Sequence, residues 1–333
     1  MRVLVIAEIG VNHNGDISLA KEMIDAACKA GADVVKFQTY IAEEVMTDKT
    51  PLAGYMGDSD NNFLDLARRL ELSIDETVEL KKYTEARGAE FMSSPFDVPS
   101  TIALAKLGLQ RLKIPSGETV NPFVLKAAAE TGLPLIVSTG MCTMEEVSNS
   151  LSFLKKHNSG PITLLHCTTQ YPADFENLNL KAMLTLGEAF GVPIGYSDHT
   201  PGIEAALAAV ALRATVIEKH FTTDRTLPGP DQAASLIPSE LKELVDCTRN
   251  ISKSLGDGVK VPKDIELEIA KVARKSLVAK KDLPAGTVLS WENVTAKRPG
   301  TGIPAWEFIN LEGKALSRDV RENDLLQTDD ICE

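Results

Sequence analysis

Residues Pro193–Phe221 read PIGYSDHTPGIEAALAAVALRATVIEKHF, and this stretch decides the fold. Its two short apolar runs, Pro193–Ser197 and Val216–His220, are typical of buried strands. The amphipathic segment Gly202–Arg213 lies between them and predicts a helix. Two strands joined by a helical crossover form a parallel pair. The stretch therefore predicts one strand–helix–strand unit, with polar residues where both strands end.

The same alternation recurs along most of the chain. Strands are expected at Val3–Glu8, Asp33–Thr39, Glu90–Ser94, Arg111–Ile114, Pro134–Ser138, Ile162–Cys167, Pro193–Ser197 and Val216–His220. Helices are expected at Ser18–Ala30, Asp75–Arg87, Val98–Leu107, Pro122–Glu130, Met144–Lys156 and Gly202–Arg213. Eight such units over about 250 residues predict a closed (β/α)8 TIM barrel. The rival fold is a doubly wound open sheet, but no GxGxxG sequence follows the first strand.

Polar residues gather at the predicted strand ends. They are Glu8, Lys36, Gln38, Ser94, Lys113, Ser116, Glu118, Ser138, His166, Ser197, His199, Glu218 and His220. Barrel active sites lie at the carboxyl ends of the strands. Because a purely structural barrel would not need so many ionisable groups there, the pattern predicts an enzyme.

His199 and His220 end two successive strands and could bind one divalent metal ion together. Glu218 lies two residues before His220, so on a strand both side chains face the same side. The alternative is that both histidines only cap strands and bond to the backbone.

Composition excludes several classes of function. The net charge of −12 over 333 residues argues against nucleic acid or an anionic membrane as the main partner, although a local basic pocket could still bind a small anion. The five cysteines are scattered without CxxC spacing, which is typical of reduced thiols in a cytosolic protein. The N-terminus resembles no signal peptide, and no apolar run approaches the ~20 residues of a membrane span. We expect a cytoplasmic protein.

Two segments depart from the regular alternation. Residues Ile41–Leu72 form a long insertion containing Gly54–Gly57, which predicts either a lid or substrate-binding loop or a plain surface excursion. After Leu255 the pattern changes to a linker and then to short strands and turns. The predicted division is a barrel over residues 1–255, a linker over 256–274 and a small β-rich domain over 275–333.

The chain resembles the bacterial nonulosonic (sialic-type) acid synthases along essentially its whole length. The matching motifs are AEIGVNHNGD (Ala7–Asp16), VVKFQT (Val34–Thr39), SSPF (Ser93–Phe96), KIPSGE (Lys113–Glu118), STGM (Ser138–Met141), LLHCT (Leu164–Thr168), YSDHT (Tyr196–Thr200), EKHF (Glu218–Phe221) and PGPD (Pro228–Asp231). The C-terminal part resembles the SAF, or antifreeze-like, domain of these enzymes, most clearly in KRPGTGI (Lys297–Ile303).

The resemblance implies condensation of phosphoenolpyruvate with the open-chain aldehyde of an N-acylated mannose-type sugar, with release of phosphate. Lys36 and Lys113 would bind the carboxylate and phosphate of phosphoenolpyruvate. The hydroxyl groups expected around the phosphate are those of Ser94, Ser116, Ser138 and Ser197. A barrel lysine could instead form a Schiff base, as in a class I aldolase.

The resemblance also implies a divalent cation, Mn²⁺ or Mg²⁺, held by His199 and His220, which would act as a Lewis acid on the aldehyde. Glu8 matches a carboxylate that handles protons, and Glu118 and Glu218 are further candidates or simply pair with Lys36 or Lys113. The expected sugar contacts are Gln38, Tyr171 and Asp231. The remaining histidines of the motifs, His13 and His166, are assigned structural roles.

The family's SAF domain reaches over the barrel of the other subunit in a domain-swapped homodimer. Arg298 matches the arginine that enters the partner's active site and contacts the sugar there. The alternative is a solvated arginine in a turn.

Two departures bear on the acceptor sugar. Pro115 stands where neuraminate-forming relatives have glycine, and Thr169 replaces an asparagine that faces the N-acyl sugar. With the VNHNGD form of the first loop, these features resemble the branch that makes legionaminic acid from 2,4-diacetamido-2,4,6-trideoxymannose. The alternatives are N-acetylneuraminate synthase, which uses N-acetylmannosamine, and pseudaminate synthase. A non-catalytic carbohydrate-binding or assembly protein is the hypothesis from another class.

Overall fold

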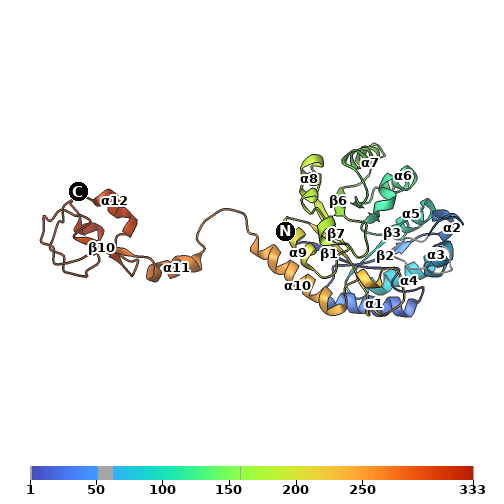
Figure 1. Ribbon diagram of the computed structural model, residues 1–333, viewed down its shortest axis with the longest axis horizontal. Helices are drawn as coiled ribbons and strands as arrows, with labels where there is room; N and C mark the ends of the chain where they lie inside the picture. Colours follow the sequence, from blue (N-terminus) through green and yellow to red (C-terminus); the bar gives the residue numbers. More distant parts are fainter. Residues whose placement is uncertain (1, 52–62, 158, 333) are drawn as a thin grey trace. The chain divides into compact units, whose positions relative to one another are not determined.

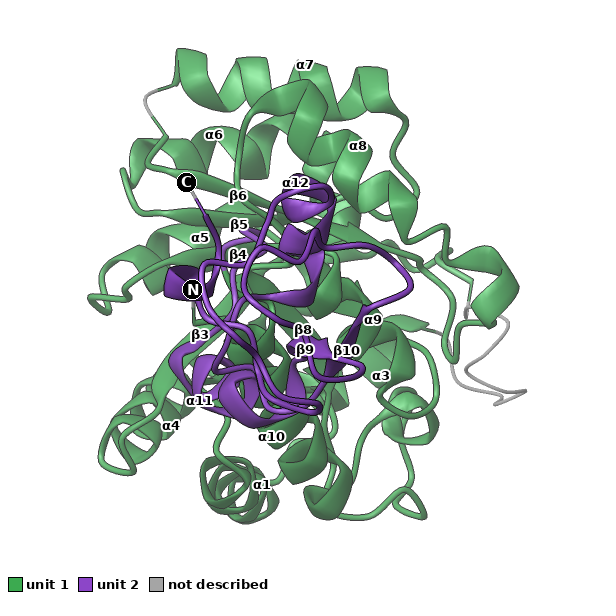
Figure 2. Cartoon of the chain, turned by 90° about the vertical axis from the view of Figure 1, so that its left-hand side faces the viewer, with its two compact units in different colours: residues 1–256 green, residues 257–333 purple. Residues whose placement is uncertain are grey.

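The computed structural model describes residues 2–51, 63–157 and 159–332. The chain divides into two compact units, Met1–Gly256 and Asp257–Glu333, coloured separately in Figure 2.

The first unit is built on eight parallel strands. They are β1 (Leu4–Gly10), β2 (Val34–Thr39), β3 (Glu90–Pro95), β4 (Leu112–Ile114), β5 (Leu135–Ser138), β6 (Ile162–Cys167), β7 (Ile194–Asp198) and β8 (Val216–His220). Their order in the sheet is β3-β2-β1-β8-β7-β6-β5-β4, so the first strand pairs with the last. Because β3 and β4 also lie close together, the sheet closes. The predicted (β/α)8 barrel is confirmed.

Helices surround the strands, as Figure 1 shows. They are α1 (Ile17–Ala30), α2 (Ala42–Val45), α3 (Phe63–Leu70), α4 (Ile74–Glu85), α5 (Val98–Ala105), α6 (Pro122–Glu130), α7 (Met144–Lys156), α8 (Lys181–Phe190), α9 (Glu204–Ala211) and α10 (Pro238–Ser254). Short 3-10 turns occur at η2 (Ser116–Val120), η3 (Phe175–Asn177) and η4 (Gln232–Ala234).

Local signals explain where several helices begin. Asp16 accepts hydrogen bonds from two backbone amides at the start of α1, and Gly31 ends that helix in the left-handed conformation. Ser73 and Thr143 each form a capping box with the glutamate three residues later, at the starts of α4 and α7. These caps satisfy amide groups that the helices leave free.

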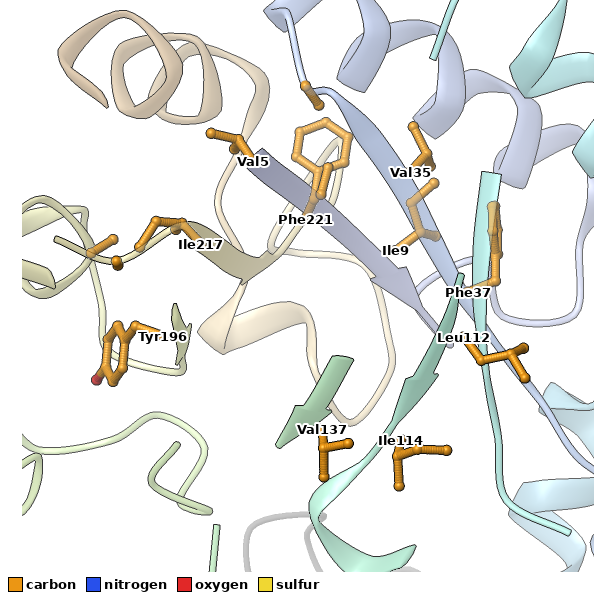
Figure 3. Close-up of a cluster of buried hydrophobic side chains, with 14 of the residues drawn as sticks. Val5, Ile9, Val35, Phe37, Leu112, Ile114, Val137, Tyr196, Ile217 and Phe221 are labelled. Atoms are coloured by element: carbon orange, nitrogen blue, oxygen red, sulfur yellow. The ribbon is translucent and has the colours of Figure 1, made fainter. Parts of the chain in front are cut away.

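Alternate residues along each strand face opposite sides of the barrel wall. The outward set packs against the helices and forms the main core, part of which appears in Figure 3, with Val5, Val35 and Ile217 among its members. The inward set forms a separate cluster whose members are Leu4, Ile6, Val34, Met92, Ile136, Leu165 and Val216. Two residues further along the same strands stand polar groups, including Glu8, Lys36 and Glu218. An apolar layer therefore fills the barrel below a polar layer.

One charged pair is buried on the outer side of the barrel. Lys219 on β8 and Asp198 on β7 are both fully buried, and their Nζ and Oδ2 atoms lie 2.8 Å apart. Lys219 also donates to Thr200. The pair joins the two strands that carry His199 and His220.

The second unit contains α11 (Asp264–Ala273) and an antiparallel pair of strands, β9 (Ser276–Ala279) and β10 (Val294–Lys297). It adds η5 (Ala305–Glu307), α12 (Phe308–Leu311) and η6 (Thr328–Asp330). A small core of its own holds it together, including Leu277, Leu289, Phe308 and Leu326. Among the helices of the described residues, none is long and apolar enough to cross a membrane.

The Lys219–Asp198 pair yields a stability prediction. Lys219→Met should lower the free energy of unfolding by about 3 to 5 kcal/mol, because it leaves the Asp198 carboxylate buried without its counter-charge. The double variant Lys219→Met/Asp198→Asn should be less destabilised than Lys219→Met alone. Urea unfolding measures both.

Lys242→Met is the matched control, because Lys242 pairs with Asp246 on the solvent side of α10, where both side chains are about half exposed. It should cost less than about 1 kcal/mol. Equal losses for the buried and the exposed lysine would contradict a structural role for the buried pair.

Candidate active site

A cavity of about 250 Å³ lies at the carboxyl ends of the strands. Most of the residues singled out from the sequence line it, namely Glu8, Lys36, Gln38, Ser94, Lys113, Ser116, Ser138, Tyr171, Ser197, His199, Glu218, His220 and Asp231. The structure thus brings together side chains that are up to 223 residues apart, from Glu8 to Asp231.

Strand register explains this convergence. Glu8 pairs with Lys36 on one side and with His220 on the other. Ser197 pairs with Glu218 between β7 and β8. Partners in register point the same way from the sheet, so all of these groups face the barrel interior.

Glu218 lies between the two buried lysines. Its Oε1 is 3.5 Å from the Nζ of Lys113, and its Oε2 is 3.7 Å from the Nζ of Lys36. Ser197 donates a hydrogen bond of 3.0 Å to the same carboxylate. The two ammonium groups hold the pKa of Glu218 down at about 2, although burial alone would raise it. Glu218 is therefore an anion that keeps two cations together.

Each lysine has further partners. Lys36 Nζ lies 2.8 Å from Glu8 Oε2 and donates to Ser94 Oγ at 3.1 Å. Lys113 Nζ donates to Ser138 Oγ at 2.7 Å. Burial lowers the pKa of Lys113 despite the nearby Glu218, whereas the two glutamates outweigh burial and raise the pKa of Lys36.

The pKa of Glu8 is shifted in the opposite direction from that of Glu218. Burial raises the pKa of Glu8, and Lys36 opposes this only in part, while the charge of Glu218 adds to the rise. Gln38 Nε2 donates to Glu8 Oε1 at 3.3 Å. A carboxyl group with a raised pKa can hold a proton and give it up, as a general acid does.

The two predicted metal-binding histidines are neighbours, with ring centroids 5.4 Å apart. His199 Nδ1 lies 2.7 Å from the backbone oxygen of Thr168. Donation from Nδ1 to this carbonyl leaves Nε2 with a free lone pair, an arrangement common among metal-binding histidines. The Tyr171 ring lies 4.0 Å from the His199 ring and 5.6 Å from the His220 ring, centroid to centroid.

His220 has an unsatisfied buried atom. Its Nδ1 has no hydrogen-bond partner among the residues that the structure describes and lies 3.8 Å from Asp231 Oδ2. Burial lowers the pKa of His220 well below its usual value, so its ring is neutral, as a metal ligand must be. Burial also acts on His199, but the charge and hydrogen bond of Cys167 outweigh it and raise the pKa of that ring.

The donors therefore fit a divalent cation held by two imidazoles. Among the described residues, no group of three or more His, Cys, Asp or Glu is placed to hold a metal ion. The remaining positions would have to come from water or substrate oxygen atoms, as an open catalytic site requires.

Two of the predicted residues lie outside the cavity lining. Glu118, on η2, accepts a hydrogen bond of 2.6 Å from Asn121 Nδ2. Arg298 belongs to the second unit, is exposed there, and donates from Nε to the oxygen of Ala273 at 3.0 Å. The roles given to them stay predictions.

The histidines assigned structural roles lie outside the lining as well. His13 accepts a hydrogen bond from the Gly15 amide at 3.0 Å, and His166 Nε2 lies 2.7 Å from the oxygen of Leu178. Both contacts are with the backbone.

One side of the cavity comes from the insertion for which the sequence left a substrate-binding loop and a surface excursion open, but none of its residues was named in advance. Val45, Met46, Phe63, Leu66, Ala67 and Leu70, all from the insertion after β2, line it. The α3 members recur at the spacing of one helix face, which is a signal that periodicity could have found. The described ends of the insertion thus border the cavity, whereas Gly54–Gly57 lie outside the described residues.

Pro115 and Thr169, the two positions that depart from neuraminate-forming relatives, both line the cavity. Thr169 and Ser116, the residue after Pro115, lie near Gly140, whose amide donates to Ser116 Oγ at 3.0 Å. A Cβ at position 140 would lie 2.3 Å from Thr169 Oγ1 and 2.8 Å from Ser116 Oγ. Only glycine fits between these two hydroxyl groups.

Comparison with known families matches both units. Residues 23–260 match the NeuB family, and residues 274–331 match the SAF domain.

Individual relatives match along nearly the whole chain. The N,N'-diacetyllegionaminic acid synthase of Campylobacter jejuni is 45% identical over 98% of this chain and 99% of its own length. The enzyme of the same name from Legionella pneumophila is 44% identical over 95% of this chain and 91% of its own. A crystal structure of the N-acetylneuraminic acid (sialic acid) synthetase of Leptospira borgpetersenii serovar Hardjo-bovis, in complex with citrate, is 40% identical, with a TM-score of 0.74 over 81% of this chain and 90% of that one.

Proposed function

The chain belongs to the NeuB family, and we propose that it condenses phosphoenolpyruvate with 2,4-diacetamido-2,4,6-trideoxymannose to give N,N'-diacetyllegionaminate and inorganic phosphate. The two relatives with the highest identities reported above, 45% and 44%, carry the name of this activity. The five cysteines, those at 28, 142, 167, 247 and 332, are all free, which suits the reducing cytoplasm as the place of the reaction.

The buried lysine pair is the observation that carries the proposal. Lys36 and Lys113 are almost completely buried, yet both reach the same cavity. Glu8 and Glu218 balance their charge, and the raised pKa of Glu8 lets it take up a proton when an anion arrives. Phosphoenolpyruvate carries about three negative charges and meets these ammonium groups and the surrounding hydroxyls in a low-dielectric site.

The reaction forms one carbon–carbon bond and breaks one carbon–oxygen bond. The π electrons of phosphoenolpyruvate form the bond from its C3 to the aldehyde carbon of the sugar, and the aldehyde oxygen takes a proton. We assign that proton to Glu8 because its raised pKa suits a general acid. Water then adds at the electron-poor C2 and gives a proton back to the Glu8 carboxylate. The resulting tetrahedral intermediate expels phosphate, and C2 becomes the ketone of the product.

A divalent cation, Mn²⁺ or Mg²⁺, would be held by His199 and His220. When bound, it would supply Lewis acidity to the aldehyde oxygen. Asp231 lies beside His220, and burial together with the charge of Glu8 raises its pKa to about 6. Its carboxyl group and the Tyr171 ring can orient the sugar next to these rings.

The metal site gives the first test of this function. His199→Ala and His220→Ala should each lower kcat by on the order of a hundredfold or more and abolish tight Mn²⁺ binding, since each removes a ligand. Activity assays and Mn²⁺ titration by electron paramagnetic resonance measure the two effects. His157→Ala, at the end of α7 and outside the cavity, is the control and should behave as the wild type. Full activity after chelation and metal removal would refute the metal requirement.

The acceptor separates this proposal from its rivals. N-acetylneuraminate synthase is the main alternative, since the Leptospira synthetase of that name is 40% identical, and pseudaminate synthase is another. Pro115 and Thr169 in the cavity lining favour an acceptor other than N-acetylmannosamine. A non-catalytic carbohydrate-binding protein is tested at the same time, because it would release no phosphate.

We expect the diacetamido trideoxy sugar to have a kcat/KM at least about a hundredfold higher than that of N-acetylmannosamine, because mismatched polar groups in a buried site are costly. Phosphate release at saturating phosphoenolpyruvate and Mn²⁺ measures both sugars side by side. Equal or better use of N-acetylmannosamine would move the assignment to neuraminate synthesis.

The SAF domain is assigned a role in a homodimer. We propose that Arg298 enters the cavity of the partner subunit and contacts the sugar there. The Arg298 guanidinium is exposed in its own unit and donates from Nε to a backbone oxygen there, which leaves its outer face open to a ligand. An arginine can bridge sugar hydroxyls and a carboxylate at once.

Subunit mixing tests the arrangement. Arg298→Ala and Lys113→Ala chains are each expected to be nearly inactive, and an equal mixture should recover about a quarter of the wild-type activity, because half of the dimers then hold one intact site of two. A mixture of Arg298→Ala with wild-type chains calibrates exchange. No recovery after demonstrated exchange would show that Arg298 acts within its own chain or not at all.

A further inference from the structure

One side of the active-site cavity is apolar and is not used by the chemistry above. We call it the apolar wall: Val45 and Met46 at the end of α2, with Phe63, Leu66, Ala67 and Leu70 on α3. The α3 members are spaced i, i+3, i+4 and i+7, so they share one face of the helix. Asp65, Arg68 and Arg69 are exposed on the other side.

The apolar wall is fixed in place by contacts of its own. Tyr40 donates its hydroxyl proton to the oxygen of Ala67 at 3.1 Å. The Ala42 amide donates to Glu71 Oε2 at 2.9 Å, which ties the start of α2 to the end of α3. Leu64, Ala67 and Leu70 pack with Val11 and Tyr40 in a local hydrophobic cluster. The wall is therefore a packed surface that can select by shape and polarity.

A polar ligand gains little from such a surface. Sugar hydroxyl groups that meet it lose their hydrogen bonds to water and gain none from these side chains. The carboxylate and phosphate of phosphoenolpyruvate are charged, and the lysines and serines that line the cavity already provide partners for them. The wall therefore calls for an apolar group on the other substrate.

We propose that the apolar wall is the subsite that receives the C6 methyl group of the acceptor sugar. This inference rests on the proposed function and deepens it. The two acetamido groups of that sugar also carry methyls, but their N–H and C=O groups need polar partners, which the side chains of the wall do not offer. The C6 methyl is the one substituent of the sugar ring atoms that is wholly apolar, and replacing it by CH₂OH would bury an unpaired hydroxyl.

Two near-isosteric substitutions test the subsite. Val45→Thr and Met46→Gln each place a polar group on the wall with little change in volume. Each should lower by about tenfold the ratio of kcat/KM for the 6-deoxy sugar to kcat/KM for 2,4-diacetamido-2,4-dideoxymannose, its 6-hydroxyl counterpart. The KM for phosphoenolpyruvate should not change, which separates a specificity effect from general damage.

Val120→Thr and Met144→Gln are the matched controls, since Val120 and Met144 are exposed and lie outside the cavity lining. Both should keep the wild-type ratio, and thermal unfolding checks that all four variants fold. For a second pair of sugars, with and without the C4 acetamido group, the ratio of kcat/KM values should be the same in the wild type and in the variants.

The outcomes separate the two proposals. If the wild type prefers N-acetylmannosamine, the proposed function fails. If the wild type prefers the 6-deoxy sugar and the wall variants keep that preference, the function stands and the subsite is wrong. The assignment would also be wrong if the wall variants changed only the preference between the sugars with and without the C4 acetamido group. The wall would then contact that acetamido group and not the C6 methyl.

Discussion

Glu218 is the constraint on which the site depends. Two ammonium groups buried in one cavity repel each other and lose their hydration, so both need a nearby negative charge. A carboxylate 3.5 Å from one and 3.7 Å from the other allows both to remain cations. Removing it would take away negative charge that supports both cations, and Lys113 would be affected first because burial already lowers its pKa. The barrel keeps this triad in position because its members stand on neighbouring levels of a closed sheet.

On β7 and β8, the side chains of one face line the cavity and those of the other face stabilise the fold. The inward side chains Ser197, Glu218 and His220 line the cavity, whereas Lys219 and Asp198 form an ion pair on the outer side. Because adjacent residues on a strand alternate between faces, a slip of one residue in register would exchange the two sets. In the slipped arrangement Lys219 and Asp198 would no longer face each other, so their ion pair favours the register that the site needs.

Much of this could be predicted from the sequence. Short apolar runs ending in polar residues gave every barrel strand, because buried parallel strands have few other patterns, and barrel topology then collected the polar ends. The sequence left open whether Glu218 pairs with Lys36 and Lys113, because such pairing depends on distances across the barrel interior that residue spacing does not give. The apolar wall was missed for another reason. Val45 and Met46 belong to a helix of four residues, too short for periodicity to reveal, and the α3 face meets the cavity only through tertiary packing.

The apolar layer inside the barrel, formed by residues such as Ile6, Met92 and Leu165, has a consequence for the order of events. It fills the barrel beneath the lysines, so within the described structure ligands reach them from above. Under the proposed function, phosphoenolpyruvate occupies the bottom of this dead end and the sugar lies over it. The anion must then enter before the sugar, and phosphate, held deepest, must leave after the nine-carbon product. The kinetic mechanism would be sequential and ordered, because the bound sugar closes the way to the phosphoenolpyruvate site.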